Sequence, residues 1–250
     1  MQAGTTTETD FFTTQDWSAY SAEQHAVWQI LYERRMSTLE NTGCSLFLSG
    51  AKAIGMSRDS VPDLYDVNRR LRDLTGWRAV PVTGFLPAAG FFACLADRRF
   101  PTTVTIRTRE QLDYLPEPDI FHDVFGHVPL HADPVFGDFL QRFGAVACRA
   151  RTEEETTWMA RLFWFTVEFG LIVEGDAVRV YGSGLISSHG DAAQAFANPA
   201  GHRPFVLDDV ISQPFEIDRM QETLFVVRDF RQLFDAVTEM AGRIGRWSGY

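Results

Sequence analysis

The stretch PEPDIFHDVFGHVPLHADPVFGDF, residues 116 to 139, places two histidines five positions apart among prolines, acids and phenylalanines. On a regular α-helix a step of five residues turns a side chain by about 500°, which would leave His122 and His127 about 140° apart. Gly126 precedes the second histidine and Pro129 follows it, and both residue types end or distort helices. The pattern therefore predicts a distorted helix that can turn both imidazoles toward one point.

A third polar residue stands in an apolar segment further along the chain. Glu168 lies in FWFTVEFGLI, residues 163–172, where a buried carboxylate costs several kcal/mol unless a positive group meets it. The nearest basic residue of this segment, Arg161, lies about two helical turns earlier and is an awkward partner. A metal is an alternative partner, because two neutral imidazoles and one carboxylate form the facial triad of non-haem Fe(II) sites.

Two other interpretations of these residues stay open at this point. His122 could form only local hydrogen bonds while Glu168 pairs with a basic residue elsewhere in the chain. A zinc hydrolase would instead carry H-E-x-x-H, with histidines four apart and a glutamate between them. The sequence H-D-V-F-G-H does not fit that pattern, which disfavours the hydrolase.

Composition restricts the class of protein. A chain of 250 residues with 45% hydrophobic residues can bury one substantial core. Its net charge of -10 argues against nucleic acid or an anionic membrane as a partner and favours small-molecule chemistry. Cys44, Cys94 and Cys148 are odd in number and form no CxxC pair, which is typical of a reducing compartment. With no targeting signal and no long apolar run, we expect a cytoplasmic protein.

Periodicity predicts a mostly helical α+β fold with a few short strands. Residues 1–16 are Thr-rich and predict a flexible lead-in, and residues 17–250 predict a single domain. Ser21 and Gln24 form a capping-box pattern before a long helix. The other predicted elements are a helix in 62–77 ended by Gly76, strands in 78–87 and 102–107 around helical turns in 89–100, a buried helix from 152 to 172, two strands around Gly175 and a closing helix in 229–245.

Three motifs carry a resemblance to a known family. The stretches LDYLPEPDIFHDVFGHVPL (112–130), LFWFTVEFGLI (162–172) and YGSGLISSHGD (181–191) resemble, in order and spacing, the signature segments of the pterin-dependent aromatic amino acid hydroxylases. The bacterial phenylalanine 4-monooxygenase branch is the most similar. The resemblance extends from HAVWQILYERR (25–35) to LFVVRDFRQLFDAV (224–237), so it covers most of the chain.

The resemblance implies a single catalytic domain with a mononuclear Fe(II) held by His122, His127 and Glu168. It also implies a tetrahydropterin, either tetrahydrobiopterin or a bacterial equivalent, that gives electrons to O2 while the ring of L-phenylalanine is hydroxylated to L-tyrosine. The main alternative is the same chemistry in a biosynthetic pathway, as a phenylalanine 3-hydroxylase or a tryptophan 5-hydroxylase. A non-catalytic amino-acid or pterin binding protein is disfavoured, because it has no need for three metal ligands.

Single positions on the substrate side also match the family. By resemblance, Arg107 clamps the carboxylate of the amino acid, a role that suits a bidentate guanidinium. Trp164 matches the aromatic wall beside the substrate ring, and its nature favours phenylalanine over tryptophan. Ser187 matches a serine near the substrate that orients an iron-ligating histidine.

The expected pterin site has five members. Phe91 matches the phenylalanine on which the pterin ring stacks, and Leu86 and Gly84 match the loop around it. Asp123 stands where animal members of the family carry a glutamate near the pterin. Glu117 matches an acid near the path of pterin and oxygen.

The length of the chain has an implication for assembly. It leaves no room for the regulatory domain or the C-terminal tetramer helix of the animal enzymes. We therefore expect a monomer or weak dimer without activation by substrate.

Overall fold

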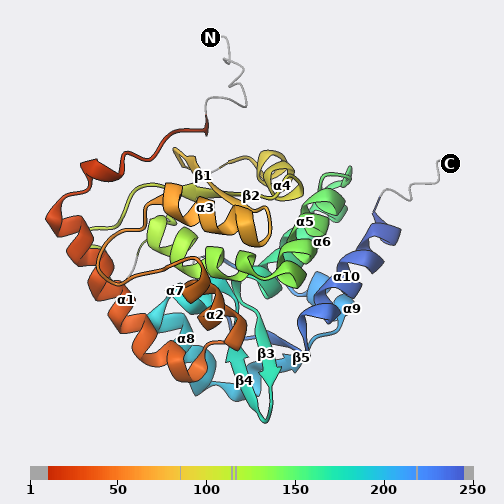
Figure 1. Cartoon of the computed structure of the whole chain (residues 1–250). Coiled ribbons are helices and arrows are strands. Elements are labelled where there is room, and N and C mark those ends of the chain that lie inside the picture. Colours follow the sequence, from red (N-terminus) through yellow and green to blue (C-terminus); the bar gives the residue numbers. More distant parts are fainter. Residues whose placement is uncertain (1–10, 85, 114, 116, 218, 245–250) are drawn as a thin grey trace, which may run out of the picture.

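Helices make up most of the protein, and its short strands form two small sheets (Figure 1). The structure is a computed structural model that describes residues 11–84, 86–113, 115, 117–217 and 219–244. The predicted α+β class with predominant helix is confirmed. No helix within these ranges is both long and apolar enough to cross a membrane.

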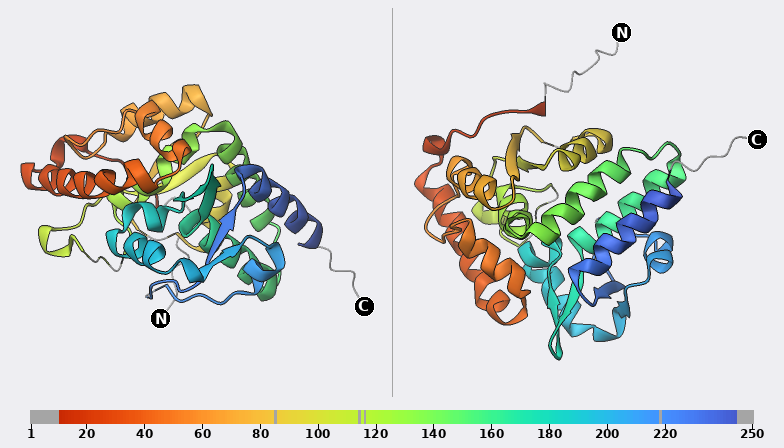
Figure 2. Two further views of the ribbon diagram at one scale, coloured as in Figure 1. Left: turned by 90° about the horizontal axis from the view of Figure 1, so that it is seen from below. Right: turned by 45° about the vertical axis from the view of Figure 1, so that its right-hand side comes forward.

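Figure 2 shows helix α10 (Phe230–Arg243) lying along α5 (Pro134–Ala147). The bounds of the α-helices are α1 Ala22–Thr42, α2 Ser45–Ala53, α3 Leu64–Leu74, α4 Ala88–Ala96, α5 Pro134–Ala147, α6 Glu153–Phe163, α7 Ser183–Ser187, α8 His189–Ala197, α9 Leu207–Ser212 and α10 Phe230–Arg243. The first sheet pairs β1 with β2 in parallel, and the second has the strand order β4-β3-β6-β5. The strand bounds are β1 Arg78–Val82, β2 Arg99–Thr103, β3 Leu171–Glu174, β4 Ala177–Val180, β5 His202–Pro204 and β6 Leu224–Val227.

Helix α1 begins where its capping box predicts. The Ser21 side chain accepts from the backbone N–H of Gln24, and the Gln24 side chain accepts from the backbone N–H of Ser21. The buried face of α1 includes Trp28, whose ring packs edge-on against Phe121 at 5.2 Å. Phe121 in turn stacks on Phe125 at 4.5 Å. These rings fix the histidine-bearing segment 121–127 against α1.

The second predicted strand was wrong in position. We expected it in residues 102–107, but β2 covers Arg99–Thr103. It pairs in parallel with β1 from Arg78 opposite Arg99 to Val82 opposite Thr103. Because β1 offers only five residues for pairing, the chain after Thr103 has no partner strand there and leaves the sheet.

The buried helix predicted for residues 152–172 ends earlier than expected. Helix α6 begins at Glu153 after a capping box with Thr152, and it continues as a short π-helix, η6, over Trp164–Glu168. Leu171 and Ile172 then pair with both β4 and β6. The sheet satisfies their backbone polar groups, so the helix gives way to a strand. The predicted turn between two strands at Gly175 is confirmed.

The N-terminal lead-in predicted for residues 1–16 falls mostly outside the described residues. Residues 11–16 run beside β1, where Phe12 forms a bridge to Val82 and the Thr13 amide donates to the carbonyl of Pro81. The division of the chain into a lead-in and one catalytic domain stays a prediction.

Candidate metal centre and active site

His122 and His127 lie in a π-helix, η4 (Phe121–His127), whose backbone hydrogen bonds join residues five apart. Such a turn brings side chains with five-residue spacing onto one face, which a regular α-helix cannot do. A 3₁₀ turn with Pro129 in its first positions follows directly. The two imidazole rings stand perpendicular to each other with centroids 5.0 Å apart. The predicted distortion of the helix is thus confirmed as a π-helical turn.

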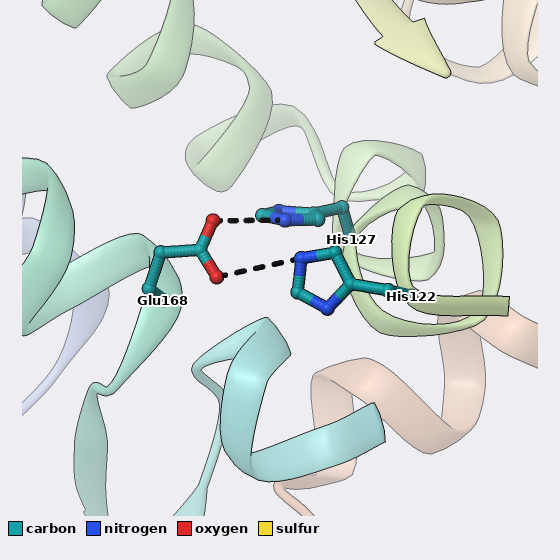
Figure 3. Close-up of side chains that lie close together, drawn as sticks. All are labelled: His122, His127 and Glu168. Atoms are coloured by element: carbon teal, nitrogen blue, oxygen red, sulfur yellow. Dashed lines mark ion pairs between the residues drawn. The ribbon is translucent and has the colours of Figure 1, made fainter. Parts of the chain in front are cut away.

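Glu168 reaches the same point from the end of a second π-helix, η6 (Figure 3). Its Oε1 lies 3.1 Å from Nε2 of His127, and its Oε2 lies 3.6 Å from Nε2 of His122. One ligand atom from each residue lies within 4.8 Å of the others. Two imidazole nitrogens and one carboxylate oxygen at this spacing match the donor set of non-haem Fe(II), so these residues could hold that metal.

The charge of Glu168 is maintained by its surroundings. Arg161 is not its partner, because that guanidinium donates to the carbonyl of Ile211. Burial by itself raises the pKa of Glu168, but the two histidines and the Ser183 hydroxyl outweigh burial and lower that pKa to about 2. Glu168 is therefore a carboxylate at neutral pH and ready to bind a cation.

Helix α7 supports two of the three candidate ligands. Ser183 Oγ donates to Oε2 of Glu168 at 2.7 Å, and Ser187 Oγ lies 2.9 Å from Nδ1 of His122. The Ser187 hydroxyl donates its proton to the carbonyl of Ser183, so it accepts the proton of Nδ1–H from His122. This tautomer leaves the lone pair of Nε2 directed toward Glu168. Ser187 was selected from sequence, whereas Ser183 was missed; its position four residues earlier on the same helix was the available signal.

Asp119 links the metal centre to Arg107. Its carboxylate accepts from Nε and Nη2 of Arg107, each at 2.9 Å, and from the backbone amide of His122 at 3.1 Å. Burial raises the pKa of Asp119, but Arg107 outweighs burial and the pKa is lowered. Asp119 was not predicted from the sequence, although it follows Pro118 within the histidine motif.

Comparison with known proteins identifies the family. Residues 15–248 match the sequence profile of the biopterin-dependent aromatic amino acid hydroxylases. The chain belongs to this family. The phenylalanine-4-hydroxylase of Chromobacterium violaceum is 42% identical over 91% of this chain and 77% of the relative, and that of Ralstonia nicotianae is 42% identical over 93% and 75%.

Solved structures agree with the family assignment. The Chromobacterium violaceum phenylalanine hydroxylase with bound Fe(III) has a TM-score of 0.89 at 39% identity and covers 96% of this chain and 90% of its own. A structure of the same enzyme with iron(III) and 7,8-dihydrobiopterin has a TM-score of 0.87 at 41% identity, with coverages of 93% and 85%. Iron and a pterin, the two groups expected from the sequence, are thus present in solved relatives of this hydroxylase.

The hydroxylase contains a chain of aromatic rings behind His127. Phe100 lies 4.5 Å from the His127 ring between centroids, and Phe163 lies nearly parallel to it at 6.5 Å. Phe91 contacts Phe163 edge-on at 5.4 Å, so it is one ring removed from the histidine. His131 donates to the carbonyl of His127, and burial lowers its pKa to about 3, which keeps it neutral.

The remaining residues expected near the pterin differ in burial and in the direction of their side chains. Leu86 and Gly84 are half-buried in the loop before α4, and Glu117 is exposed. The Asp123 carboxylate is turned toward β2, where it accepts from the amide and the hydroxyl of Thr103 at 2.7 and 2.8 Å. Burial raises the pKa of Asp123, and the nearby histidines and Thr103 offset only part of that rise.

Trp164 lies at the start of η6 in a stack of rings. Its ring is nearly parallel to that of Phe215 at 4.6 Å and is tilted against Phe169 at 4.8 Å. Phe215 comes from the segment between α9 and β6, far from Trp164 in sequence, and no local pattern marked it. Trp164, which the sequence predicts to lie beside the substrate ring, is therefore stacked on a second aromatic residue.

Proposed function

We propose that this hydroxylase converts L-phenylalanine to L-tyrosine with iron, a tetrahydropterin and O2. One oxygen atom enters the ring and the other leaves as water. Two of the four electrons come from the C–H bond that is replaced, and two come from the tetrahydropterin, which becomes a dihydropterin. The observation that carries the proposal is the meeting of His122, His127 and Glu168 in a chain that is similar to bacterial phenylalanine-4-hydroxylases.

His122, His127 and Glu168 would hold the iron, and this donor set is one that leaves room on Fe(II) for oxygen and a co-substrate. Bound iron would supply the site at which O2 is activated. The protein contributes a carboxylate that is ionised at neutral pH and a His122 tautomer that Ser187 fixes. The rings of Phe100 and Phe163 exclude water from the side of His127.

Arg107 and Trp164 orient the amino acid in this proposal. Asp119 holds Nε and Nη2 of Arg107, which leaves Nη1 as the nitrogen for which the described residues provide no acceptor. That nitrogen would receive the substrate carboxylate, and Trp164 would lie against the aromatic ring. Because Asp119 also binds the amide of His122, the carboxylate site and the metal centre are connected by one side chain.

The pterin would lie against Phe91, with Leu86 and Gly84 in the adjoining loop. Phe91 suits this role because one ring, Phe163, connects it with His127. Asp123 would influence the pterin only indirectly, through Thr103 and β2, because its carboxylate already accepts hydrogen bonds from the amide and the hydroxyl of Thr103. Glu117 is exposed and would reach the path along which pterin and oxygen enter.

The test is an anaerobic reconstitution with Fe(II) and a tetrahydropterin, followed by admission of oxygen. Phenylalanine, tyrosine and tryptophan are supplied separately, and products are identified by mass and retention time. We expect para-tyrosine only when iron, pterin and phenylalanine are all present. Meta-tyrosine or 5-hydroxytryptophan would preserve the mechanism and change the substrate assignment. Glu168→Ala should abolish turnover and metal retention. If the parent protein makes no product, and Glu168→Ala still binds phenylalanine and pterin, the protein is a binding protein and not an enzyme.

We further propose that the protein acts in the cytoplasm as a monomer or weak dimer. The odd number of cysteines and the absence of a CxxC pair support a reducing compartment. Size-exclusion chromatography with light scattering over a range of concentrations tests the assembly state.

A further inference from the structure

Arg35 is a buried cation for which the described residues provide no acidic partner. It lies in the middle of α1 with only 2% of its surface exposed. Within the described part of the chain it joins no salt bridge, and burial lowers its pKa to about 10, so it stays charged at neutral pH. A buried guanidinium carries a large desolvation penalty unless hydrogen bonds compensate it. The acceptors it uses therefore indicate its role.

Those acceptors are backbone carbonyls at the end of α7. Nε of Arg35 donates to the carbonyl of Ile186 at 2.6 Å, and Nη2 donates to that of Leu185 at 2.9 Å. Carbonyls in the last turn of a helix lack partners within the helix, and a positive charge is favourable at that end. Nη1 donates to the hydroxyl of Thr38 one turn further along α1, which holds the side chain in place. Arg35 is thus the C-terminal cap of α7.

Helix α7 also carries two serines that contact the candidate metal ligands. Ser183 binds Glu168 and Ser187 binds His122. The helix is also packed tightly against η4, since a Cβ placed on Gly126 would come within 3.0 Å of the Ser183 carbonyl oxygen. A displacement of α7 would therefore move the hydrogen bonds of two ligands at once.

We propose that Arg35 is a positioning residue of the metal centre, acting through α7 and its serines on His122 and Glu168. The inference rests on the proposed function, because it requires that the triad binds a metal. It assigns Arg35 no contact with metal, pterin or substrate.

The test measures Co(II) binding to the metal-free full-length protein by titration calorimetry and by visible absorption, which reports the ligand geometry. Replacement of a group that orients metal ligands costs at least about tenfold in affinity, so Arg35→Met should weaken Co(II) binding by about that factor. Arg35→Lys keeps the charge but lacks the planar guanidinium that binds two carbonyls at once. Its affinity for Co(II) should therefore lie between those of the parent protein and Arg35→Met. Arg34→Gln is the matched control: Arg34 is the preceding residue, half exposed, and pairs with Asp113 on the surface. It should bind Co(II) as the parent does.

A double-mutant cycle separates positioning from general stabilisation. If Arg35 acts through the serines, Arg35→Met should change Co(II) affinity by less than about twofold in a Ser183→Ala/Ser187→Ala background. An equal loss in both backgrounds, or no loss in the parent background despite a lower melting temperature, would overturn the proposal. Should Arg35→Met fail to fold, Arg35→Lys and Arg35→Gln enter the same cycle.

The proposed function and this inference fail differently. If the parent protein binds Co(II) no better than Glu168→Ala does, the triad is not a metal site and the proposed function fails. If the parent binds Co(II) tightly and every folded Arg35 variant matches it in affinity and spectrum, only the positioning role is refuted.

Discussion

The contact between the start of α7 and the backbone of Glu168 gives the sharpest test of the architecture. Gly182 caps the N-terminus of α7, and a Cβ there would lie 2.3 Å from the amide nitrogen of Gly170 and 2.5 Å from the carbonyl oxygen of Glu168. Both atoms belong to the backbone, so no side chain can swing aside. Overpacking of this kind costs about 1–3 kcal/mol. For a chain of this size, Gly182→Ala should lower the Tm by about 2–12 °C.

The measurement is thermal unfolding of the metal-free protein, followed by circular dichroism, so that metal binding does not contribute to stability. Gly90→Ala is the control, because a Cβ at Gly90 meets only the flexible end of Leu86 at 3.9 Å. An alanine inside α4 gains about 0.5–1 kcal/mol of helix stability, so this control should hold or raise the Tm. Gly182→Ala should also weaken Co(II) binding, since Ser183 is the next residue. A Gly182→Ala variant with the parental Tm would refute the close packing on which the account of α7 depends.

Three further predictions concern the substrate side and the surface. Arg107→Lys loses the bidentate contact with Asp119 that would hold Nη1 toward the substrate carboxylate, so it should raise the KM for phenylalanine at least about tenfold, with a smaller change in kcat, as steady-state kinetics would show. Phe215→Ala removes a ring stack and should weaken phenylalanine binding about three- to tenfold in calorimetry while Co(II) affinity stays at the parental value. A thiol reagent should label the exposed Cys148 in the native protein and all three cysteines after unfolding, because the other two are buried and burial raises the pKa of Cys44 to about 12.

The features that could be predicted from the sequence are those encoded locally. The capping box of α1 is complete within Ser21–Gln24, and the hairpin at Gly175 needs only a few adjacent residues. The strand β2 was misplaced because its start and its end depend on those of β1, with which it pairs in parallel from another segment of the chain. The early end of the helix at Glu168 has the same origin, since the sheet takes over Leu171 and Ile172.

The supporting residues of the site were harder to predict than the candidate ligands. Nothing in the sequence around Asp119 marks it as part of the site. Its role follows from the fold, in which its carboxylate accepts from both Arg107 and the His122 amide. Arg35 stands at helical spacing with Leu31 and Leu39, which places it on the buried face of α1, but the local sequence does not indicate what it contacts there. Its burial follows from α7 packing behind it, across about 150 positions of sequence, as the hydrogen bond to Ile186 shows. Contacts of this kind depend on the assembled fold, so the local sequence does not identify the partner.

The five-residue spacing of the histidines is the exception, since it carries information about an irregular backbone. Had His122 and His127 belonged to a regular α-helix, about 140° would separate them and only one could face Glu168. A π-helical turn joins residues five apart, so the same spacing becomes a shared face. The five-residue spacing and the π-helical turn are therefore both needed for the two histidines to bind one metal. Glu168 also ends a π-helical turn, but its two partners lie on another segment, so no spacing within 164–168 could reveal it. Glu168 was identified instead from the energetic cost of burying a carboxylate among aromatic residues, which requires a cation as its partner.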